Sequence, residues 1–313
     1  MIGAPLYLGV DGGGTKTEFV CIDAQGVELA RARTGPTYHL GIGVPGVAQQ
    51  LTQGVRVIAA SLGVATDAFA YAFFGLPAHG EDREADTQLH AACGALLGHT
   101  RYACGNDMIC GWAGSLGCED GINVVAGTGS ICYGEHAGRT ARAGGWGEVF
   151  SDEGSAYWIA IEGLAAFSRM SDGRLPPGPL LPAVRKALAL SDDIDACQRV
   201  MGPPGMSRDQ IAALAPLVTA AALQGDGAAR AILDRAADHL AGIALALRRT
   251  LGFSEETAVS LSWSGSILNE VEPVRTRFIT LLQEVAPFAP TVPRHTPAYG
   301  AALYAKRLAN RDR

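Results

Sequence analysis

The sequence lacks the features that mark membrane-spanning, secreted and nucleic-acid-binding proteins. Its 313 residues include no uninterrupted apolar run of about 18 residues, so we expect no membrane span. No basic region followed by an apolar stretch opens the chain, so we expect no signal peptide. The net charge is −6, and the tightest basic groups are only Arg248–Arg249 and the tail Arg311–Arg313. This scatter argues against a nucleic-acid surface.

Paired cysteines are also absent. The seven cysteines are odd in number, none lies in a Cys-x-x-Cys pair, and several fall in apolar runs. This pattern predicts reduced, buried thiols in a cytoplasmic protein. With 48% hydrophobic and 18% charged residues, the chain can bury sizeable cores, in two domains or one large one.

The most informative stretch lies near the start of the chain. The apolar run Leu6–Val10 predicts a buried strand that ends at Asp11, and Phe19–Ile22 predicts the returning strand. Between them lie Gly12–Gly14 and Thr15, where backbone N–H groups and a hydroxyl can bind an anion. Asp11 is placed to hold hydrated Mg²⁺, which prefers one or two carboxylates plus phosphate oxygens. The alternative is a glycine-rich hairpin without a ligand.

Two common nucleotide motifs are excluded at this stretch. Gly9–Thr17 almost forms a P-loop, but Thr15 stands where the lysine should be, and the Gly-x-Gly-x-x-Gly spacing is missing.

The pattern restarts in the middle of the chain. Ile122–Ala126 predicts a strand, Gly127–Ser130 a glycine and hydroxyl turn, and Ile131–Gly134 a returning strand. An internal repeat would place two phosphate-binding hairpins across a cleft. The alternative is that Gly127–Ser130 is only a hairpin turn.

The remaining elements are predicted from periodicity and from turn residues. A loop over residues 34–46 carries Tyr38 and His39. Ser151 or Asp152 is expected to cap a helix. We expect strands at 27–33, 69–75 and 102–104, and a strand that enters a glycine turn within 261–266. We expect helices from Pro45 to about Leu62 and over 85–97, 228–251 and 297–309, and a loop at 176–182.

Motifs across the chain resemble a known superfamily. The order of Asp11–Thr17, Asp107, Gly127–Ser130, Gly144–Trp158 and Ser264–Ser266 is that of the sugar kinase, hsp70 and actin superfamily. More narrowly, Gly-Gly-Trp-Gly followed by Asp-Glu-Gly-Ser-Ala-Tyr-Trp-Ile-Ala resembles the eukaryotic-type N-acetylglucosamine kinases of the BadF/BadG/BcrA/BcrD ATPase family. No motif can be matched within 164–211.

The resemblance implies an α/β fold of two ribonuclease H-like (actin-like ATPase) domains, each on a five-stranded mixed sheet, with an interdomain cleft. We expect one domain over 1–118, with the helix of 297–313 packed back on it, and a second over 119–296. The resemblance also implies MgATP, an amino sugar and a homodimer. The ATP-binding residues would be Gly13, Gly14, Thr15, Lys16, Thr128, Gly265 and Ser266, with Asp11 on the metal.

The implied reaction transfers the γ-phosphate to the 6-hydroxyl of the sugar. Asp107 matches the family's general base, which takes the proton of the attacking hydroxyl. The alternative is that Asp107 only caps the helix that starts at Met108. The implied sugar-binding residues are Tyr38, His39, Asp107, Ser130, Ile131, Gly145, Trp146, Gly147 and Asp152, although Trp146 could instead pack in a core.

Two sugar-contacting positions depart from the animal enzymes. Tyr38 and Ile131 stand where those enzymes have asparagine. Losing two polar partners can shift the preference among hexosamines. Glucosamine therefore stays open as an alternative to N-acetylglucosamine.

Three other functions remain as alternatives. An ATPase activator of acyl-CoA dehydratases or reductases would ligate an iron–sulfur cluster, but Cys104, Cys110 and Cys118 lack the spacing. Bacterial repressors and kinases with structural zinc are disfavoured, because Cys118 has no partner cysteines or histidine. A non-catalytic sugar sensor would not need Asp11, Asp107 and Asp152 together.

Overall fold

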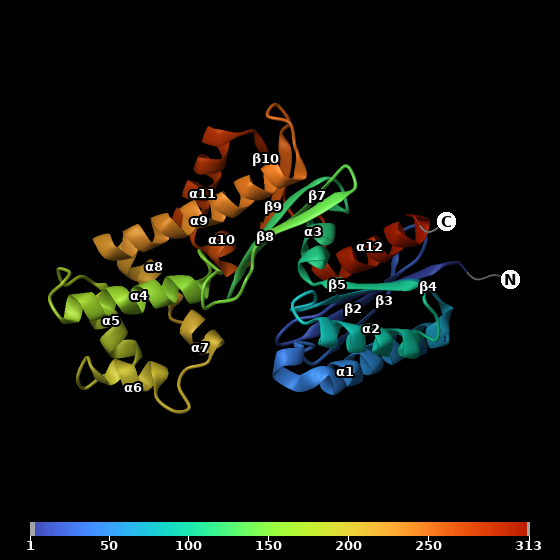
Figure 1. Cartoon of the computed structure of the whole chain (residues 1–313), viewed down its shortest axis with the longest axis horizontal. Helices are drawn as coiled ribbons and strands as arrows, with labels where there is room; N and C mark the ends of the chain where they lie inside the picture. Colours follow the sequence, from blue (N-terminus) through green and yellow to red (C-terminus); the bar gives the residue numbers. More distant parts are fainter. Residues whose placement is uncertain (1–3, 312–313) are drawn as a thin grey trace. The chain divides into compact units, whose positions relative to one another are not determined.

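The computed structural model describes residues 4–311, which divide into two compact units (Figure 1). Unit 1 runs to Asp120 and resumes at Thr291, and unit 2 comprises Gly121–Pro290. The units thus divide after residues 120 and 290, whereas the sequence led us to expect domain boundaries after residues 118 and 296.

Unit 1 is built on a five-stranded mixed sheet of order β3-β2-β1-β4-β5. The antiparallel pairs β1–β2 and β2–β3 form the meander expected from the sequence, and β4 and β5 join β1 in parallel. The predicted first hairpin is therefore confirmed. The strands are β1 (Leu6–Asp11), β2 (Thr17–Ile22), β3 (Glu28–Thr34), β4 (Phe69–Leu76) and β5 (Tyr102–Asn106).

Helices cover both faces of this sheet (Figure 1). On one face, α1 (His39–Leu62) and α2 (Arg83–Leu97) bury an apolar core that includes Leu51 and Leu89. The other face carries α3 (Met108–Leu116) and α12 (Pro297–Arg311), so the end of the chain packs back on unit 1 as expected. A short 3₁₀ helix, η1 (Thr66–Ala68), precedes β4.

Gly9 in β1 lets α12 approach the sheet closely. A Cβ at Gly9 would collide with the backbone of Ala301 and Ala302 on α12. Any larger residue there would force the helix away from the strand.

Unit 2 repeats the strand topology of unit 1. Its sheet has the order β10-β9-β6-β7-β8, with β6, β7 and β8 antiparallel and β9 and β10 in parallel with β6. Each strand of unit 2 thus has a counterpart in unit 1, which confirms the internal repeat. The strands are β6 (Gly121–Ala126), β7 (Ser130–His136), β8 (Arg139–Gly144), β9 (Val259–Ser264) and β10 (Phe288–Pro290).

The helices of unit 2 follow a different plan. Between β3 and α1, unit 1 has only residues 35–38, whereas residues 145–226 lie between β8 and the corresponding long helix of unit 2, α9 (Gly227–Leu251). This insertion contains α4 (Ala156–Ser171), α5 (Leu180–Ala187), α6 (Asp195–Met201), α7 (Arg208–Ala212) and α8 (Ala215–Leu223). After β9 come α10 (Ser266–Glu270) and α11 (Glu272–Val285).

The helix α9 forms where the sequence predicts it. Its buried stripe includes Ile232, Leu240 and Leu247, and it packs on β6, β7 and β8. Asp226 caps the start, accepting a hydrogen bond from the Ala229 N–H (3.0 Å). Gly252 ends the helix in the left-handed conformation that glycine tolerates best.

Three local expectations are wrong. A helical turn begins at His39 inside the expected loop, because Gly41 N–H and Ile42 N–H both donate to the Tyr38 carbonyl. Gly43, at φ 70° and ψ 160°, then interrupts α1 before Pro45. The expected loop over 176–182 overlaps the first turn of α5, and α4 is capped by neither Ser151 nor Asp152. Instead Ser155 Oγ accepts the Trp158 N–H at 3.2 Å.

Among residues 4–311, no single helix combines the length and apolar composition of a membrane span; the segments 208–223 and 227–251, bent by 118°, meet those criteria only as a pair.

Candidate functional site

The expected site residues fall into two groups at equivalent strand edges. In unit 1, β1, β4 and β5 are parallel and in register, so Asp11, Gly75 and Gly105 lie side by side. Asp107 follows at the carboxyl end of β5. Carboxyl ends of parallel strands are where open α/β sheets bind ligands. The fold therefore places two carboxylates on the ligand-binding edge of unit 1, on either side of β4.

The first glycine loop has glycines of two kinds. Gly12 and Gly13 are needed for packing: a Cβ would lie 2.8 Å from Gly75 O at Gly12 and 2.8 Å from Lys16 O at Gly13. Gly14 is different, since it is exposed, has no positive φ, and its Cβ would meet nothing within 4 Å. The fold itself therefore does not require glycine at position 14. A ligand that comes close to this backbone would require glycine there, because a Cβ would take up the space.

The rest of this loop is open to solvent. Thr15 and Lys16 are exposed, and the Lys16 ammonium lies 2.6 Å from Glu18 Oε1. Thr37 N–H donates to the Gly13 carbonyl at 3.0 Å, which fixes the base of the loop. The loop tip is thus exposed on a fixed base.

The two carboxyl groups of unit 1 have strongly altered acidity. Burial raises the pKa of Asp11 to about 8, and the nearby carboxylates of Asp107 and Glu18 add to the shift. Burial raises the pKa of Asp107 to about 6, with a further contribution from Glu81. Perturbed carboxylates gathered at a strand edge are typical of functional sites. A general base with a pKa near 6 is ionised at neutral pH and still able to take a proton.

Capping does not account for Asp107. Its side chain makes no N-cap hydrogen bond to α3 by ordinary cap geometry, and the nearby Met108 N–H only partly offsets the rise in its pKa. The neighbouring Asn106 does this work, accepting the Met108 N–H at Oδ1 (3.1 Å) and donating from Nδ2 to the His79 carbonyl (3.3 Å). A role in holding the helix start therefore does not explain the carboxylate of Asp107.

The structure places Tyr38 and His39 at the start of α1. Their rings meet edge to face, with centroids 6.2 Å apart. His39 is buried, and neither ring nitrogen has a hydrogen-bond partner. A buried imidazole without partners is costly, so His39 is a group that a polar ligand could satisfy.

In unit 2, the second loop lies at the matching edge. Gly127, Thr128 and Gly129 connect β6 to β7, and Gly127 and Thr128 accept hydrogen bonds from the N–H groups of Ala156 (2.8 Å) and Tyr157 (3.2 Å) at the start of α4. Ser130 is buried and donates to the Glu153 carbonyl at 2.8 Å. The loop is therefore fixed by the segment Gly144–Trp158, which we call the sugar motif because the family resemblance implies that it binds sugar.

Gly265 brings the end of β9 against this loop. It has φ 92°, and a Cβ there would collide with the backbone of Ala126. Close approach of two backbones requires glycine at this position. Ser266 follows as the first residue of α10.

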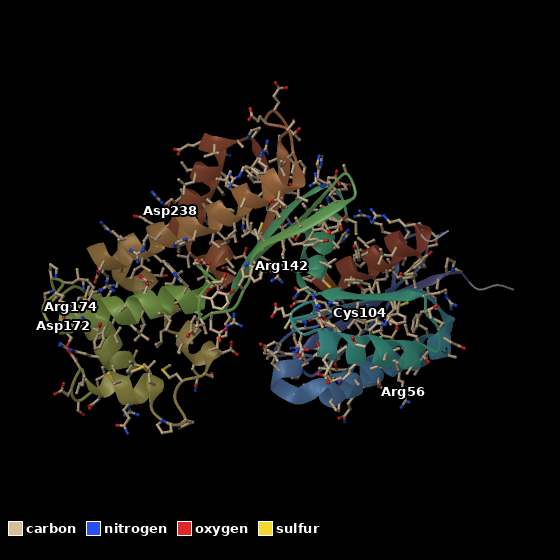
Figure 2. All side chains as sticks on the ribbon, viewed as in Figure 1. Arg56, Cys104, Arg142, Asp172, Arg174 and Asp238 are labelled. Carbon is tan, nitrogen blue, oxygen red and sulfur yellow. The ribbon has the colours of Figure 1, made fainter. Side chains whose placement is uncertain are left out.

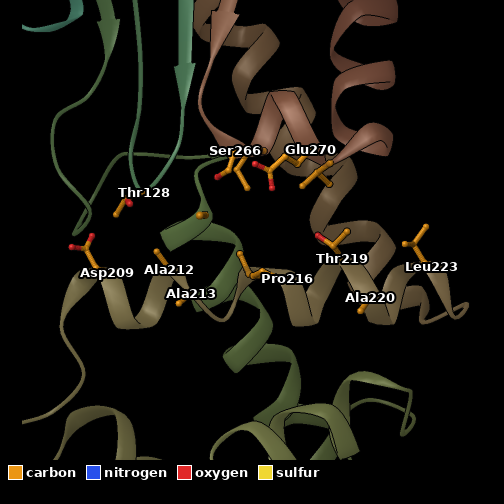
Figure 3. Close-up of a pocket in the computed structure, with 14 residues that line it drawn as sticks. Thr128, Asp209, Ala212, Ala213, Pro216, Thr219, Ala220, Leu223, Ser266 and Glu270 are labelled. Atoms are coloured by element: carbon orange, nitrogen blue, oxygen red, sulfur yellow. The ribbon is translucent and has the colours of Figure 1, made fainter. Parts of the chain in front are cut away.

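Thr128 and Ser266 line one pocket that lies within unit 2 (Figure 3). Its volume is about 510 Å³, and α7 and α8 provide the opposite wall. That wall is largely alanine, which leaves room for a flat apolar group, while polar atoms come from residues such as Asp209, Thr219 and Glu270. An apolar pocket with a few polar groups is the usual form of a small-molecule site. Gly265 is not among the residues that line this pocket, but it precedes Ser266, which is.

The sugar motif forms a loop between β8 and α4. Trp146 is 65% exposed, which rules out the core-packing alternative, and Arg142 of β8 (labelled in Figure 2) lies with Cζ 5.0 Å from the ring centroid. Gly145 and Gly147 have positive φ values of 69° and 97°. A Cβ at Gly145 would lie 2.5 Å from Ile131 Cδ1, so Ile131 packs under this loop. Only glycine fits this turn without strain.

Asp152, the last sugar residue expected, is buried and strained. It has a left-handed φ of 58°, uncommon for a residue other than glycine. Arg208 of α7 donates from Nη2 to Asp152 Oδ2 at 2.5 Å. Burial raises the pKa of Asp152, and the Arg208 charge acts against that shift. Backbone strain of this kind persists where the surroundings fix it, often at functional sites.

The donor set fits a magnesium ion held partly by a ligand. Within residues 4–311, no group of three or more histidine, cysteine or acidic side chains is placed to hold a metal. Asp11 is a buried carboxylate at the loop whose pKa lies far above its ordinary value, and a nearby cation would offset that cost. Magnesium is commonly held by one or two carboxylates plus phosphate oxygens. Asp11 therefore fits Mg²⁺ that arrives with a nucleotide.

Two neighbours of the site make contacts that the sequence analysis did not predict. Cys110 lies one turn after Asp107, donates from Sγ to the Val10 carbonyl at 3.6 Å, and hydrogen-bonds Asp11. Cys110 follows Asp107 by three residues, and on a helix this spacing places the two side chains on the same face, so their proximity could have been predicted. Arg208 lies in a region without motifs, and nothing in the sequence indicates its contact with Asp152.

Comparisons with known proteins find relatives that match most of the chain. A curated N-acetylmuramic acid/N-acetylglucosamine kinase of Clostridium acetobutylicum is 28% identical over 302 residues, covering 96% of this chain and 97% of that protein. An N-acetyl-D-glucosamine kinase of Dictyostelium discoideum is 29% identical, covering 83% of this chain and 84% of that protein.

Solved structures show the same fold. A Chromobacterium violaceum protein, described as a candidate N-acetylglucosamine kinase, is 26% identical with a TM-score of 0.74, covering 96% of this chain and 99% of that one. A ROK hexokinase from Thermus thermophilus, 17% identical with a TM-score of 0.58, covers 98% and 100% and is similar in fold alone. The expected α/β fold of two units, each on a five-stranded mixed sheet, is confirmed.

The family expected from the motifs is confirmed as well. The model of the BadF/BadG/BcrA/BcrD ATPase family matches residues 8–305, which include both glycine loops, both strand edges and the sugar motif. This chain belongs to the BadF/BadG/BcrA/BcrD ATPase family.

Proposed function

We propose that this protein is an ATP-dependent hexosamine kinase that phosphorylates the 6-hydroxyl of N-acetylglucosamine. The observation that carries the proposal is the pair of carboxylates at the strand edge of unit 1, beside an exposed glycine loop. The substrates named for the clostridial and Dictyostelium relatives support the choice of sugar.

Each group has a defined task in this reaction. Asp107 accepts the proton of the attacking sugar hydroxyl, and its pKa of about 6 keeps it ionised at neutral pH. Gly13, Gly14, Thr15 and Lys16 bind phosphate oxygens at the first loop. Because phosphoryl transfer needs little covalent chemistry from the protein, these groups act chiefly by positioning and charge stabilisation.

Magnesium would be held by Asp11 together with phosphate oxygens. When bound, the ion neutralises charge on the phosphates. Binding it also requires Asp11 to lose its proton, so the raised pKa of Asp11 couples metal binding to pH.

Unit 2 supplies the remaining contacts. We assign Thr128, Gly265 and Ser266 to the nucleotide, with the adenosine in the pocket of Figure 3. In unit 2 we assign Ser130, Ile131, Gly145, Trp146, Gly147 and Asp152 to the sugar. In unit 1 the residues assigned to the sugar are Tyr38, His39 and Asp107. The cytoplasmic location and the homodimer expected from the sequence are part of the same proposal.

Glucosamine is the second candidate sugar. Tyr38 and Ile131 replace asparagines that contact the sugar in the animal enzymes, and Ile131 packs under Gly145 in the sugar loop. An apolar side chain there offers no hydrogen bond to the sugar.

The activator and zinc alternatives receive no support from the cysteines. Cys110 is buried beside Asp11, and none of the described cysteines belongs to a group placed to hold a metal.

The proposed function is tested by ADP release with MgATP and a panel of N-acetylglucosamine, glucosamine, N-acetylmannosamine, glucose and N-acetylmuramic acid. We expect turnover that depends on N-acetylglucosamine. Two results would contradict the proposal: ADP release that needs no sugar, and the absence of ADP release with every sugar of the panel.

A further inference from the structure

Arg208 enters the sugar site from a region that carries no motif. It is the first residue of α7, within the insertion of unit 2, and its side chain is 39% exposed. Its Nη2 donates to Asp152 Oδ2 at 2.5 Å, while its Nε lies 3.4 Å from Glu148 Oε2. One guanidinium therefore joins the sugar loop to α7 through two carboxylates.

The second glycine loop is packed against the same contact. A Cβ at Gly129 would lie 2.5 Å from Arg208 Nη2 and 2.7 Å from Asp152 Oδ2. The backbone N–H of Ser130 also hydrogen-bonds the Asp152 carboxylate. The carboxylate is thus held from two directions, by the loop backbone and by Arg208, directly beside the expected phosphate loop.

Asp152 needs such a partner because its surroundings oppose a negative charge. It is 3% exposed, and the charged groups that act on it are Arg208 of α7 and Glu148 of its own loop, of which only Arg208 is positive. A buried carboxylate without a cation takes up a proton more readily. A protonated Asp152 would accept fewer hydrogen bonds from sugar hydroxyl groups.

We propose that Arg208 is a positioning residue that holds the Asp152 carboxylate ionised and directed beside the second loop, ready to accept sugar hydroxyl groups. This inference rests on the proposed function. It gives the region without motifs a role in sugar affinity. It also assigns α7 to both ligands, because the next residue, Asp209, lines the pocket that contains Thr128 and Ser266.

The test is calorimetric binding of N-acetylglucosamine to the full chain at pH 6, 7 and 8. In Arg208→Gln we expect the Kd to rise about tenfold at pH 8. At pH 6 an unpaired Asp152 is more protonated than at pH 8. The ratio of the variant Kd to the wild-type Kd should therefore be at least about threefold larger at pH 6 than at pH 8. Arg208→Lys keeps the charge, so its ratio should not change with pH.

The matched control is Arg174→Gln. Arg174 also pairs with an aspartate in the insertion, at 2.6 Å from Asp172 Oδ2, but both side chains are exposed (Figure 2). Exposed pairs contribute little, so this variant should bind sugar like the wild type. In an Asp152→Asn background, Arg208→Gln should have no further effect, because the group it positions has lost its charge.

Each remaining outcome counts against the inference. A loss of affinity in Arg208→Gln that is independent of pH, or that is equally large in the Asp152→Asn background, would indicate a merely structural role. If Arg208→Gln does not fold, the same cycle with Arg208→Lys should give about a threefold loss that vanishes with Asp152→Asn, and a loss that persists would overturn the inference. Wild-type protein that binds no sugar would overturn the proposed function, and this inference with it.

Discussion

The two units share a strand topology but differ in the charges at the matching edges. In unit 1, the strand that opens the glycine loop ends in Asp11, and Asp107 follows two strands away. In unit 2, the corresponding strand β6 ends in Ala126, and the loop that follows carries only glycines and hydroxyl groups. The repeated scaffold thus supplies two backbone loops, and only one of them has carboxylates of its own.

Unit 2 obtains its carboxylate from the insertion instead. Asp152 belongs to the segment between β8 and α9, where unit 1 has only four connecting residues, 35–38. Burial raises the pKa of all three carboxyl groups, to about 8 at Asp11 and about 6 at Asp107, but only Asp152 hydrogen-bonds an arginine, Arg208, whose charge acts against the shift. The carboxylates of unit 1 are therefore left to titrate, whereas a cation holds the carboxylate of unit 2. We infer that metal and proton chemistry belong to unit 1 and sugar selection largely to unit 2.

The largest expected effect is at Asp107. Asp107→Asn keeps the size of the side chain but cannot take a proton, so kcat should fall at least about 100-fold. Sugar binding should remain within a few-fold of the wild type. ADP release and calorimetry measure the two quantities, and a variant with more than about a tenth of the wild-type kcat would show that Asp107 is not the base.

The pH dependence of the rate is a second test of Asp107 as the general base. Asp107 must be ionised to act, and its pKa lies near 6 in the protein without ligands. The value of kcat/KM for sugar, measured from pH 5 to 8 at saturating MgATP so that the titration of Asp11 does not contribute, should therefore rise about tenfold per pH unit below 6 and level off above it. A profile that is flat across this range would contradict a base with this pKa.

The contrast in titration also predicts an effect on stability. The pKa of Asp11 is about 8 in the folded protein against an ordinary value near 3.8, so between these values the folded state binds more protons than the unfolded state. Its contribution to stability is present at low pH and is lost as pH rises through about 8. Asp11→Asn lacks this titration. Without nucleotide or magnesium, its Tm should therefore rise relative to the wild type from pH 5 to 9.

A difference in Tm between these two proteins that stays constant with pH would contradict the burial of an ionisable Asp11. The matched comparison is Asp172→Asn, since Asp172 is exposed and ion-paired with Arg174. Its Tm should follow that of the wild type at every pH in this range.

The sequence predicts the scaffold better than it predicts the charges. Alternating apolar runs and glycines correctly indicate both hairpins, because strand and turn propensities are local. The contact between Arg208 and Asp152 joins residues 56 positions apart, and no local pattern records it. The prediction of the capping residue of α4 was wrong because several polar residues near its start could serve as the cap. Ser155 caps the helix, rather than Ser151 or Asp152.

Two glycines of unit 1, Gly9 and Gly14, allow an effect on stability to be told apart from an effect on nucleotide binding. Gly9→Ala would collide with the backbone of α12 and should cost about 1–3 kcal/mol of stability. Gly14→Ala meets no atom and needs no positive φ, so its Tm should be unchanged while the KM for ATP rises about tenfold. Thermal melts and ATP titrations on both variants test this, and an unchanged KM in Gly14→Ala would remove the case for nucleotide contact there.

The smallest expected effect is at Trp146 of unit 2. Because the side chain is 65% exposed, Trp146→Ala should change the free energy of unfolding by less than about 0.5 kcal/mol. Loss of an aromatic surface for the sugar ring should raise the KM for sugar about three- to tenfold. Unchanged sugar kinetics would place Trp146 outside the sugar site.

In the proposed reaction, the carboxylates of unit 1 direct the γ-phosphate of ATP to the 6-hydroxyl of an amino sugar. Phosphorus NMR of a reaction with N-acetylglucosamine and MgATP identifies the oxygen that receives the phosphate. We predict one new phosphomonoester, coupled to the two protons on C6, in equal amount to ADP, and its absence with Asp107→Asn. A 1-phosphate, or ADP without any sugar phosphate, would show that the proposed reaction is wrong.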